Sequence, residues 1–321
     1  MSGLITCMGE ILIDFLPIEE DGRTVGFRMH PGGSPLNVAV GAARMGQPAA
    51  FAGKVAADFF GRHLRGYVES EGIDTRFLQT VESPTTLAFV AYEGGDAAYA
   101  FYGDAAADTL LSVDDLPPAL FEETSALQIG SISLLRGTTP AAILATAERL
   151  KGRALISLDP NIRPGLVHDE AGYRALLDRL FALADVVKIS TVDLDWLAPG
   201  QPVEATMADL MRRGPALVVV TRGGEGVLAL HGGRAYAEDS FPVTVIDTIG
   251  AGDTYDAGLL VGLAERGALS REKLEALAPE ELSATLRFAG AAAAINCSRA
   301  GANPPSRAEV AAFLARPGGS A

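Results

Sequence analysis

Cysteine is scarce in this chain. Two cysteines, Cys7 and Cys297, occur among 321 residues, and neither belongs to a Cys-x-x-Cys pair. A disulfide framework needs several cysteines, and a structural zinc site needs cysteines or histidines at short spacing. The four histidines are scattered without such spacing: His30, His63, His168 and His231. Neither a disulfide scaffold nor a zinc centre is expected.

Long apolar runs and excess positive charge are also missing. No run approaches 18 residues without glycine or charge, so no membrane span is expected. The first residues lack the charged and apolar regions of a secretory signal. A net charge of −14 disfavours nucleic-acid binding, although local amides, a few basic side chains and a metal can still hold a nucleotide. A cytoplasmic enzyme is the expectation.

Apolar residues are abundant, at 48%, and follow a regular order of strand and helix patterns in the second half. The expected strands are Ala126–Gly130, Ala154–Asp159, Val186–Ser190 and Leu217–Thr221. The helices between them are Thr139–Lys151, Glu170–Ala184 and Val203–Arg213. Alternating βα units predict an α/β fold, a mainly parallel sheet with helices on both faces.

The first half has the same alternation, with one interruption. The expected strands are Leu4–Met8, Ile11–Phe15 and Ala50–Val55, and the helices are Ser34–Met45 and Phe59–Ser70. Two further strand patterns, Thr85–Tyr92 and Ala97–Tyr102, flank Glu93-Gly94-Gly95-Asp96, which predicts a hairpin with a loop longer than two residues. This hairpin breaks the βα order and is assigned to a small β appendage.

The last third begins with a β region. It covers Gly226–Pro242 and precedes three helices, Ala251–Arg266, Glu280–Cys297 and Ser306–Ala315. The tail Pro317–Ala321 is expected to be disordered.

Gly250-Ala251-Gly252-Asp253 is the most informative stretch. Small residues before a helix allow close approach to amides that have no partner within the helix, which favours an anion. An acid would repel that anion, unless Asp253 is a base that takes a proton from a hydroxyl. The stretch thus suits phosphoryl transfer to an alcohol, with a tight turn capped by Asp253 as the alternative.

Two other glycine-rich loops are candidate binding segments. Pro31-Gly32-Gly33-Ser34-Pro35-Leu36-Asn37 leads into a helix, and Asn37 suits sugar hydroxyls. Thr221-Arg222-Gly223-Gly224-Glu225-Gly226 follows a strand and suits phosphate. A dinucleotide fingerprint also matches from Gly224, but the following Val227–His231 looks like a strand rather than the required helix.

Polar residues gather where strands end. They are Asp14, Asp159, Asn161, Ser190 and Thr221. Ligands of open α/β sheets bind beyond the carboxyl ends of the strands, so their shared position favours a common site, although each alone could be a cap or turn residue.

The two glycine-rich stretches Gly32–Ala39 and Asp247–Gly258 resemble the two signatures of the ribokinase-like (PfkB) carbohydrate kinases. They occur in the right order, more than 200 residues apart. Within the family the chain is most similar to fructokinases, through Gly9–Phe15, Ala52–Val55, Thr85–Val90 and Asp159–Pro164. The resemblance implies one Rossmann-like kinase domain over residues 1–321, with a β-sheet lid formed by about 12–32 and 85–104.

The resemblance also implies roles for individual residues. Asp253 would be the base, with an anion hole at Gly250, Ala251 and Gly252 and with Arg163 near the transferred phosphate. The sugar would be bound by Asp14, Gly32, Gly33 and Asn37. The nucleotide would be bound by Lys188, Ser190, Thr221, Gly223, Gly226 and Asn296. A monovalent cation would be held by oxygens of Asp247, Ile249, Asn296, Arg299 and Gly301.

One family motif departs from its usual form. The Asn-x-x-Glu motif associated with magnesium stands here as Ser190-Thr191-Val192-Asp193. Asp193 is therefore a Mg²⁺-associated candidate whose metal role the departure puts in question.

These expectations describe an ATP-dependent, Mg²⁺-using and K⁺-responsive sugar kinase acting on fructose. The alternatives are another sugar kinase, such as a 2-keto-3-deoxygluconate kinase, a nicotinamide-dependent oxidoreductase, and a non-catalytic sugar-binding regulator. A small-molecule sugar and ATP are the expected partners, and the sequence leaves open whether the chain forms a homodimer.

Overall fold

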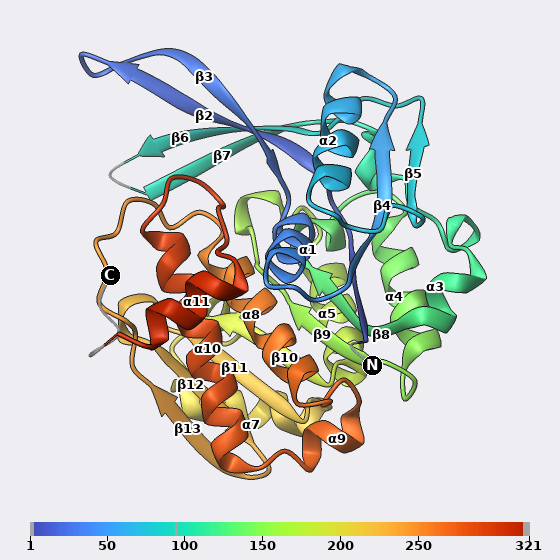
Figure 1. Cartoon of the computed structure of the whole chain (residues 1–321). Coiled ribbons are helices and arrows are strands. Elements are labelled where there is room, and N and C mark those ends of the chain that lie inside the picture. Colours follow the sequence, from blue (N-terminus) through green and yellow to red (C-terminus); the bar gives the residue numbers. More distant parts are fainter. Residues whose placement is uncertain (1–2, 94–95, 317–321) are drawn as a thin grey trace.

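A nine-stranded sheet forms the centre of the protein, in a computed structural model that describes residues 3–93 and 96–316 (Figure 1). Its strand order is β13-β12-β11-β10-β9-β8-β1-β4-β5. The strands are β1 (Leu4–Met8), β4 (Ala49–Ala56), β5 (Leu78–Val81), β8 (Thr124–Gly130), β9 (Leu155–Asp159), β10 (Val186–Ser190), β11 (Leu217–Thr221), β12 (Val227–His231) and β13 (Arg234–Glu238). All neighbouring pairs from β5 to β11 are parallel, and β12 is antiparallel to both of its neighbours.

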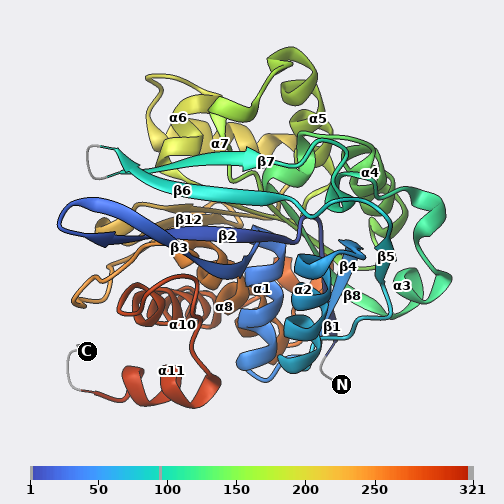
Figure 2. The ribbon, with the colours of Figure 1, turned by 90° about the horizontal axis from the view of Figure 1, so that it is seen from above.

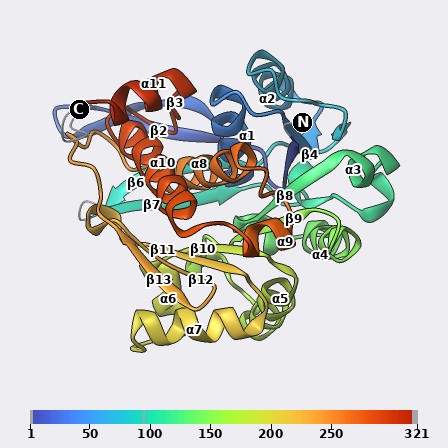
Figure 3. The same cartoon turned by 60° about the horizontal axis from the view of Figure 1, so that its bottom comes forward.

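Helices cover both faces of this sheet (Figure 3). One face carries α1 (Ser34–Arg44), α2 (Phe59–Ser70), α8 (Ala251–Glu265), α9 (Arg271–Glu275), α10 (Pro279–Cys297) and α11 (Arg307–Leu314). The other carries α3 (Pro118–Glu123), α4 (Thr139–Leu150), α5 (Glu170–Leu183), α6 (Thr191–Leu197) and α7 (Val203–Arg213). Alternate residues of a strand enter opposite cores, as Val219 and Val220 of β11 do. The predicted α/β fold is confirmed.

A second, four-stranded sheet lies above the first (Figures 1 and 2). It contains β2 (Leu12–Glu20), β3 (Arg23–Gly32), β6 (Leu87–Glu93) and β7 (Asp96–Tyr102), in the order β3-β2-β6-β7. These strands fall within the two segments assigned to a lid, whose closure over a sugar remains a prediction. The register pairs Glu93 with Asp96, so the hairpin loop is shorter than predicted.

Most predicted elements agree with the structure to within a few residues. The sequence analysis missed β3, β5 and the short helices α3, α6 and α9. β3 is largely exposed and mixes charged with apolar residues, which hides its alternation. The tail 317–321 lies outside the described residues. Among the described residues, no helix is both long and apolar enough to cross a bilayer.

The order of strands across the large sheet reverses at β1, because the strands that follow along the chain are added first on one side of it, through β4, and later on the other side, through β8. Such a switch point opens a crevice at the carboxyl ends of the two strands. Glu10 follows β1, and Ser131 follows β8. The topology therefore places the candidate site here, beneath the small sheet.

Candidate active site

A cavity lies between the small sheet and the carboxyl edge of the large one. Leu12, Asp14 and Phe101 line it from the small sheet, and Gly33 and Asn37 line it from the start of α1. Its opposite wall includes Arg163, Gly250 and Asp253. The structure thus brings together three of the four sugar-binding candidates, the predicted base and part of its anion hole, while Gly32 does not line the cavity.

Helix α8 begins inside this wall. Gly250 precedes it with φ of 70°, and a Cβ there would lie 2.6 Å from the Cβ of Ala302, so the turn requires glycine. The N–H of Ala251 donates to the carbonyl of Thr248 at 3.2 Å, so this predicted anion-hole amide already has a partner. The first turn of α8 still directs its amides and its dipole toward the cavity.

Asp253 is buried on the first turn of α8 and receives two hydrogen bonds from α1. The hydroxyl of Ser34 donates to Oδ1 at 2.7 Å, and Nδ2 of Asn37 donates to Oδ2 at 2.8 Å. Burial raises the pKa of Asp253 above its ordinary value, while the bonds from Asn37 and Ser34 act to lower it. Asn37, predicted to hold sugar hydroxyls, therefore also contacts the base.

Asp14 extends from β2 into the same cavity. Burial and the neighbouring charge of Asp253 raise its pKa to about 7, although Arg163 acts in the opposite direction. A Cβ on Gly32 would lie 2.0 Å from Oδ2 of Asp14, so glycine is needed there to make room for the carboxylate. Arg163 donates to the side-chain oxygen of Asn161 at 2.6 Å.

Glu10 is a buried carboxylate in the floor of the cavity. It accepts from the backbone N–H of Ser34 at 3.0 Å and from that of Ser133 at 3.2 Å, and it also bonds the Ser133 hydroxyl. Burial raises its pKa to about 7, and these hydrogen bonds act against that rise. Glu10 thereby joins the end of β1, the start of α1 and the segment after β8.

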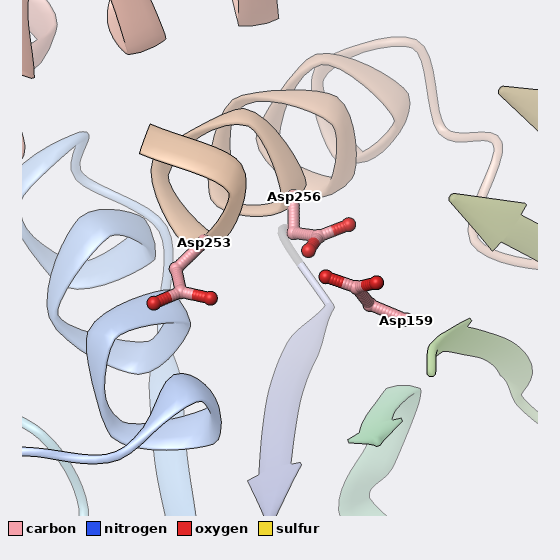
Figure 4. Close-up of side chains that lie close together, drawn as sticks. All are labelled: Asp159, Asp253 and Asp256. Atoms are coloured by element: carbon pink, nitrogen blue, oxygen red, sulfur yellow. The ribbon is translucent and has the colours of Figure 1, made fainter. Parts of the chain in front are cut away.

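A buried ion-pair cluster lies directly behind Asp253. Asp159 ends β9, Asp256 lies one turn along α8 from Asp253, and carboxylate oxygens of all three lie within 4.8 Å of one another (Figure 4). Nζ of Lys188, from β10, lies 2.5 Å from Asp159 and 3.1 Å from Asp256. The lysine ammonium therefore supplies the positive charge that a metal would otherwise bring.

The cluster also shifts the pKa of its members. Burial acts to lower the pKa of Lys188, but Asp159 and Asp256 outweigh it, so its pKa lies above the ordinary value. Burial raises the pKa of Asp256, with Lys188 opposing and Asp159 adding to the rise. The ammonium of Lys188 faces inward to these two carboxylates, and its contact with ATP stays a prediction.

The nucleotide-binding candidates lie along the ends of β10 and β11. Ser190 and Thr221 are register partners there, and Gly223 and Gly226 both have positive φ, at 56° and 83°. A Cβ on Gly226 would lie 2.1 Å from the carbonyl oxygen of Glu238. Val227–His231 is strand β12, so the nicotinamide alternative is wrong: the helix required by a dinucleotide fingerprint is not there.

Asp193 has its carboxylate already engaged. Oδ1 accepts from the N–H of Ile162 at 3.0 Å, and Oδ2 accepts from the hydroxyl of Ser190 at 2.8 Å. Ser190 in turn caps α6 by accepting from the N–H of Asp193. This arrangement fits a structural anchor better than a direct Mg²⁺ ligand.

The five cation-site candidates lie close together near the start of α8. Asp247 accepts from the N–H groups of Ile249 at 3.0 Å and Gly301 at 2.8 Å. Nδ2 of Asn296 donates to the carbonyl of Ile249 at 2.8 Å, and the N–H of Arg299 donates to the carbonyl of Asn296 at 3.0 Å. Asn296 is fully buried in this loop cluster, and its predicted nucleotide contact stays a prediction.

The sequence analysis missed four contributors: Ser34, Glu10, the pairing of Asp159 with Lys188, and Asp256. An acid three residues beyond Asp253 on an otherwise apolar helix was a usable signal for Asp256. Nothing in the sequence alone could tell that the side chain of Ser34 meets a residue 219 positions away.

The comparisons with known proteins show the family of this chain. The model of the pfkB family of carbohydrate kinases matches residues 2–309. A fructokinase of Rhizobium leguminosarum bv. trifolii is 36% identical over 279 residues, which cover 87% of this chain and 85% of that protein.

Solved structures give the same relationship. The fructokinase of Xylella fastidiosa with bound ATP superposes with a TM-score of 0.90 at 30% identity, covering 97% of this chain and 98% of that one. The fructokinase of Vibrio cholerae, with fructose, ADP and a calcium ion bound, gives 0.86 at 26% identity, with 98% and 99% covered. A double mutant of that enzyme, with fructose, ADP and a potassium ion, also gives 0.86, at 27% identity, with 98% of each chain covered. This chain, with its cavity at the switch point and its buried aspartate on the first turn of α8, belongs to the pfkB family of carbohydrate kinases.

Proposed function

We propose that this carbohydrate kinase transfers the γ-phosphate of ATP to the primary hydroxyl of fructose, giving fructose 6-phosphate and ADP. The observation that carries the proposal is Asp253, a carboxylate at the start of α8, in a cavity with acceptor groups for a sugar. The similarity to fructokinases supports the choice of sugar.

Asp253 is the base in this mechanism. As the sugar oxygen attacks the γ-phosphorus, an O–P bond forms, the bond to the bridging oxygen of ADP breaks, and the hydroxyl proton passes to Asp253. The amides of the first turn of α8 and the guanidinium of Arg163 stabilise the negative charge of the transferring group. The small sheet, acting as a lid, excludes water that would compete as the acceptor.

Asp14 makes the cavity suited to a neutral sugar. With a pKa of about 7 it is ionised above neutral pH, where its carboxylate accepts hydrogen bonds from hydroxyls and would repel a sugar acid beside it. The net charge of −14 gives an anionic substrate no long-range attraction. Fructose is therefore favoured over 2-keto-3-deoxygluconate.

Two ions belong to the proposal. Mg²⁺ would accompany the ATP phosphates and reduce their charge; Asp193 is not assigned to it, because its oxygens hold the N–H of Ile162 and the hydroxyl of Ser190 in place. K⁺ would be held by oxygens of the loop around Asp247 and Asn296, where the carbonyl of Ile249 accepts one hydrogen bond and retains a second lone pair. If so, activity rises when K⁺ replaces a bulky organic cation at constant ionic strength; a flat response would remove K⁺ from the proposal.

The proposal also includes the oligomeric state of the enzyme and its place in the cell. The enzyme works as a homodimer in the cytoplasm, where ATP is available. The support for a dimer is the apolar outer face of the small sheet, where Phe27 is 44% and Tyr102 is 62% exposed.

A coupled ADP-release assay over a panel of sugars tests the proposal. We expect fructose to give the highest kcat/KM of the panel, which should also include ribose, glucose and 2-keto-3-deoxygluconate. A higher kcat/KM for 2-keto-3-deoxygluconate would contradict the argument from Asp14. Release of ADP at the same rate with and without sugar would remove sugar phosphorylation itself.

A further inference from the structure

Ser34 is a residue of the cavity to which the mechanism above gives no role. It is the first residue of α1, and its hydroxyl donates to Oδ1 of Asp253 at 2.7 Å. Nδ2 of Asn37, one turn further along α1, holds the other oxygen at 2.8 Å. Each oxygen of the carboxylate thus has one donor from α1, and the two donors fix the plane of the carboxylate. Each oxygen also keeps a second acceptor position.

The position of Ser34 is itself fixed from below. Its backbone N–H donates to Oε1 of Glu10 at 3.0 Å, and Glu10 is held in turn by the N–H of Ser133 at 3.2 Å. A continuous set of hydrogen bonds therefore runs from the segment after β8, through Glu10 and Ser34, to Asp253. These contacts join three parts of the chain that are far apart in sequence.

We propose that Ser34 is a positioning residue for the catalytic base: held by Glu10, its hydroxyl orients the carboxylate of Asp253 and keeps it in the ionised form that accepts the sugar proton. The proposal rests on the function proposed above, in which Asp253 is the base. Ser34 itself takes no proton and forms no bond to phosphorus.

The electrostatic surroundings make this donor matter. Burial disfavours the ionised form of Asp253, and a donor to the carboxylate opposes that effect. The groups that surround Asp253 come from several elements. Those that interact with its charge are Ser34 and Asn37 of α1, Lys188 of β10, Asp159 of β9, Asp14 of β2 and Asp256 of α8 itself. Glu10 and Arg163 line the same cavity. Of these, only Lys188 and Arg163 carry positive charge, so the loss of one donor is not readily replaced.

Ser34→Ala isolates the hydroxyl, because Glu10 contacts the backbone N–H of residue 34, which the substitution leaves in place. We would measure kcat and KM for fructose from pH 5.5 to 9.5. Loss of a donor raises the pKa of a carboxylate, so the acid limb of kcat should move up by roughly one pH unit. The loss in kcat should then grow as the pH falls, and approach roughly ten times the loss at pH 9 once the pH lies below both acid limbs. Ser34→Thr, which keeps a hydroxyl, should return the limb toward the wild-type position.

Ser270→Ala is the matched control, since it removes the capping hydroxyl of α9 and leaves the cavity unchanged. It should leave the pH profile as in the wild type. Thermal melts of all three variants identify any loss of folding, and Ser34→Thr keeps the test valid if Ser34→Ala melts early. An unmoved acid limb in folded Ser34→Ala would overturn the proposal, as would a rise in KM alone at every pH, because that result assigns Ser34 to sugar binding.

Asp253→Asn separates this inference from the function on which it rests. If Asp253→Asn keeps its turnover, the base itself is wrongly assigned and both fail. If Asp253→Asn is inactive while Ser34→Ala behaves as the wild type, only the positioning role fails.

Discussion

The site contains five buried or partly buried carboxyl groups, and two positively charged side chains, Lys188 and Arg163, lie close to them. Glu10, Asp14 and Asp253 face the cavity, and Asp159 and Asp256 lie behind it with Lys188. Burial raises the pKa of Glu10 and Asp14 to about 7. Neighbouring carboxyl groups of this kind divide between charged and neutral forms near neutral pH. The protonation of individual residues is therefore part of how the site works.

Asp253→Asn tests the base directly. The amide keeps the size of the side chain and can still pair with Ser34, but it cannot take a proton. We expect turnover to fall roughly 10²- to 10⁴-fold, the usual contribution of a positioned general base, with sugar binding retained. Steady-state turnover with fructose, alongside fructose binding by calorimetry, measures the two effects separately. Turnover near the wild-type rate in a folded variant would remove Asp253 from the mechanism.

Asp14 gives a prediction about stability and pH. Its pKa in the folded, sugar-free protein, about 7, exceeds the ordinary value of 3.8, so the folded state binds more protons between these values. The free energy of unfolding therefore falls as pH rises from about 4 to about 7 because of this residue, and is level above. Asp14→Asn removes that fall.

Melting curves of the sugar-free protein measure the difference. The Tm of Asp14→Asn relative to the wild type should rise by a few degrees between pH 4 and pH 8. A difference that stays constant across this range would show that Asp14 is not held in an unfavourable charged state.

At the scale of elements, Lys188 joins β10 to β9 and to α8 through its two ion pairs. Lys188→Met would leave Asp159 and Asp256 facing each other without a cation. We expect it to lower the free energy of unfolding by about 3–5 kcal/mol. Urea denaturation at pH 7 measures this loss.

Asp256→Asn is the contrasting variant. It keeps the shape of the side chain and removes one negative charge from a cluster with more carboxylates than cations. Its free energy of unfolding should stay within about 1 kcal/mol of the wild type. Equal losses in the two variants would contradict the view that the lysine, rather than Asp256, is essential to the cluster.

Helices and strands could be predicted where their own residues carry a clear pattern of apolar and polar positions. Val186–Ser190 and Val203–Arg213 have the bounds predicted from the sequence. The first is a short run of almost entirely buried residues, and the second buries Thr206, Met207 and Leu210 on one helical face. β3 escaped because its residues are mostly exposed, so that no alternation of apolar and polar residues marks it.

For the site, glycine-rich turns and strand ends identified Asp14, Asn37 and Asp253 from the sequence. The sequence could not indicate that Lys188 points inward, because its partners Asp159 and Asp256 are brought close only by folding. The contact of Ser190 with Asp193 is local by contrast, since the two residues have the three-residue spacing of a helix cap.

At the scale of the whole molecule, the small sheet has two different faces. Asp14 points into the cavity, while its neighbour Phe15 lies on the opposite face, stacked on Phe89 with ring centroids 4.8 Å apart. The ring of Phe27 packs edge-on against that of Phe89, with ring centroids 5.1 Å apart. This outer face is apolar, and part of it is exposed.

Phe27→Asp tests whether a second copy covers that face. A charge there should separate a homodimer into monomers, which light scattering after gel filtration would detect as a halved mass. Arg234→Asp is a suitable control, because it also introduces an exposed aspartate, here by reversing a charge on β13 at the far end of the other sheet. A wild-type protein that is already monomeric would contradict the proposed dimer.

Helix α8, which packs against both α1 and α10, determines when activity can first arise during synthesis. Ser34 and Asp253 are 219 residues apart, and a ribosome adds about 5–20 residues per second, so roughly 10–40 seconds pass between them. During that interval a nascent chain has made Asp14 and Asn37, which line the proposed sugar site, but not Asp253, the proposed base. A polypeptide that ends before α8 therefore lacks the proposed base, and on this proposal phosphotransfer to the sugar begins only after α8 has been translated and folded.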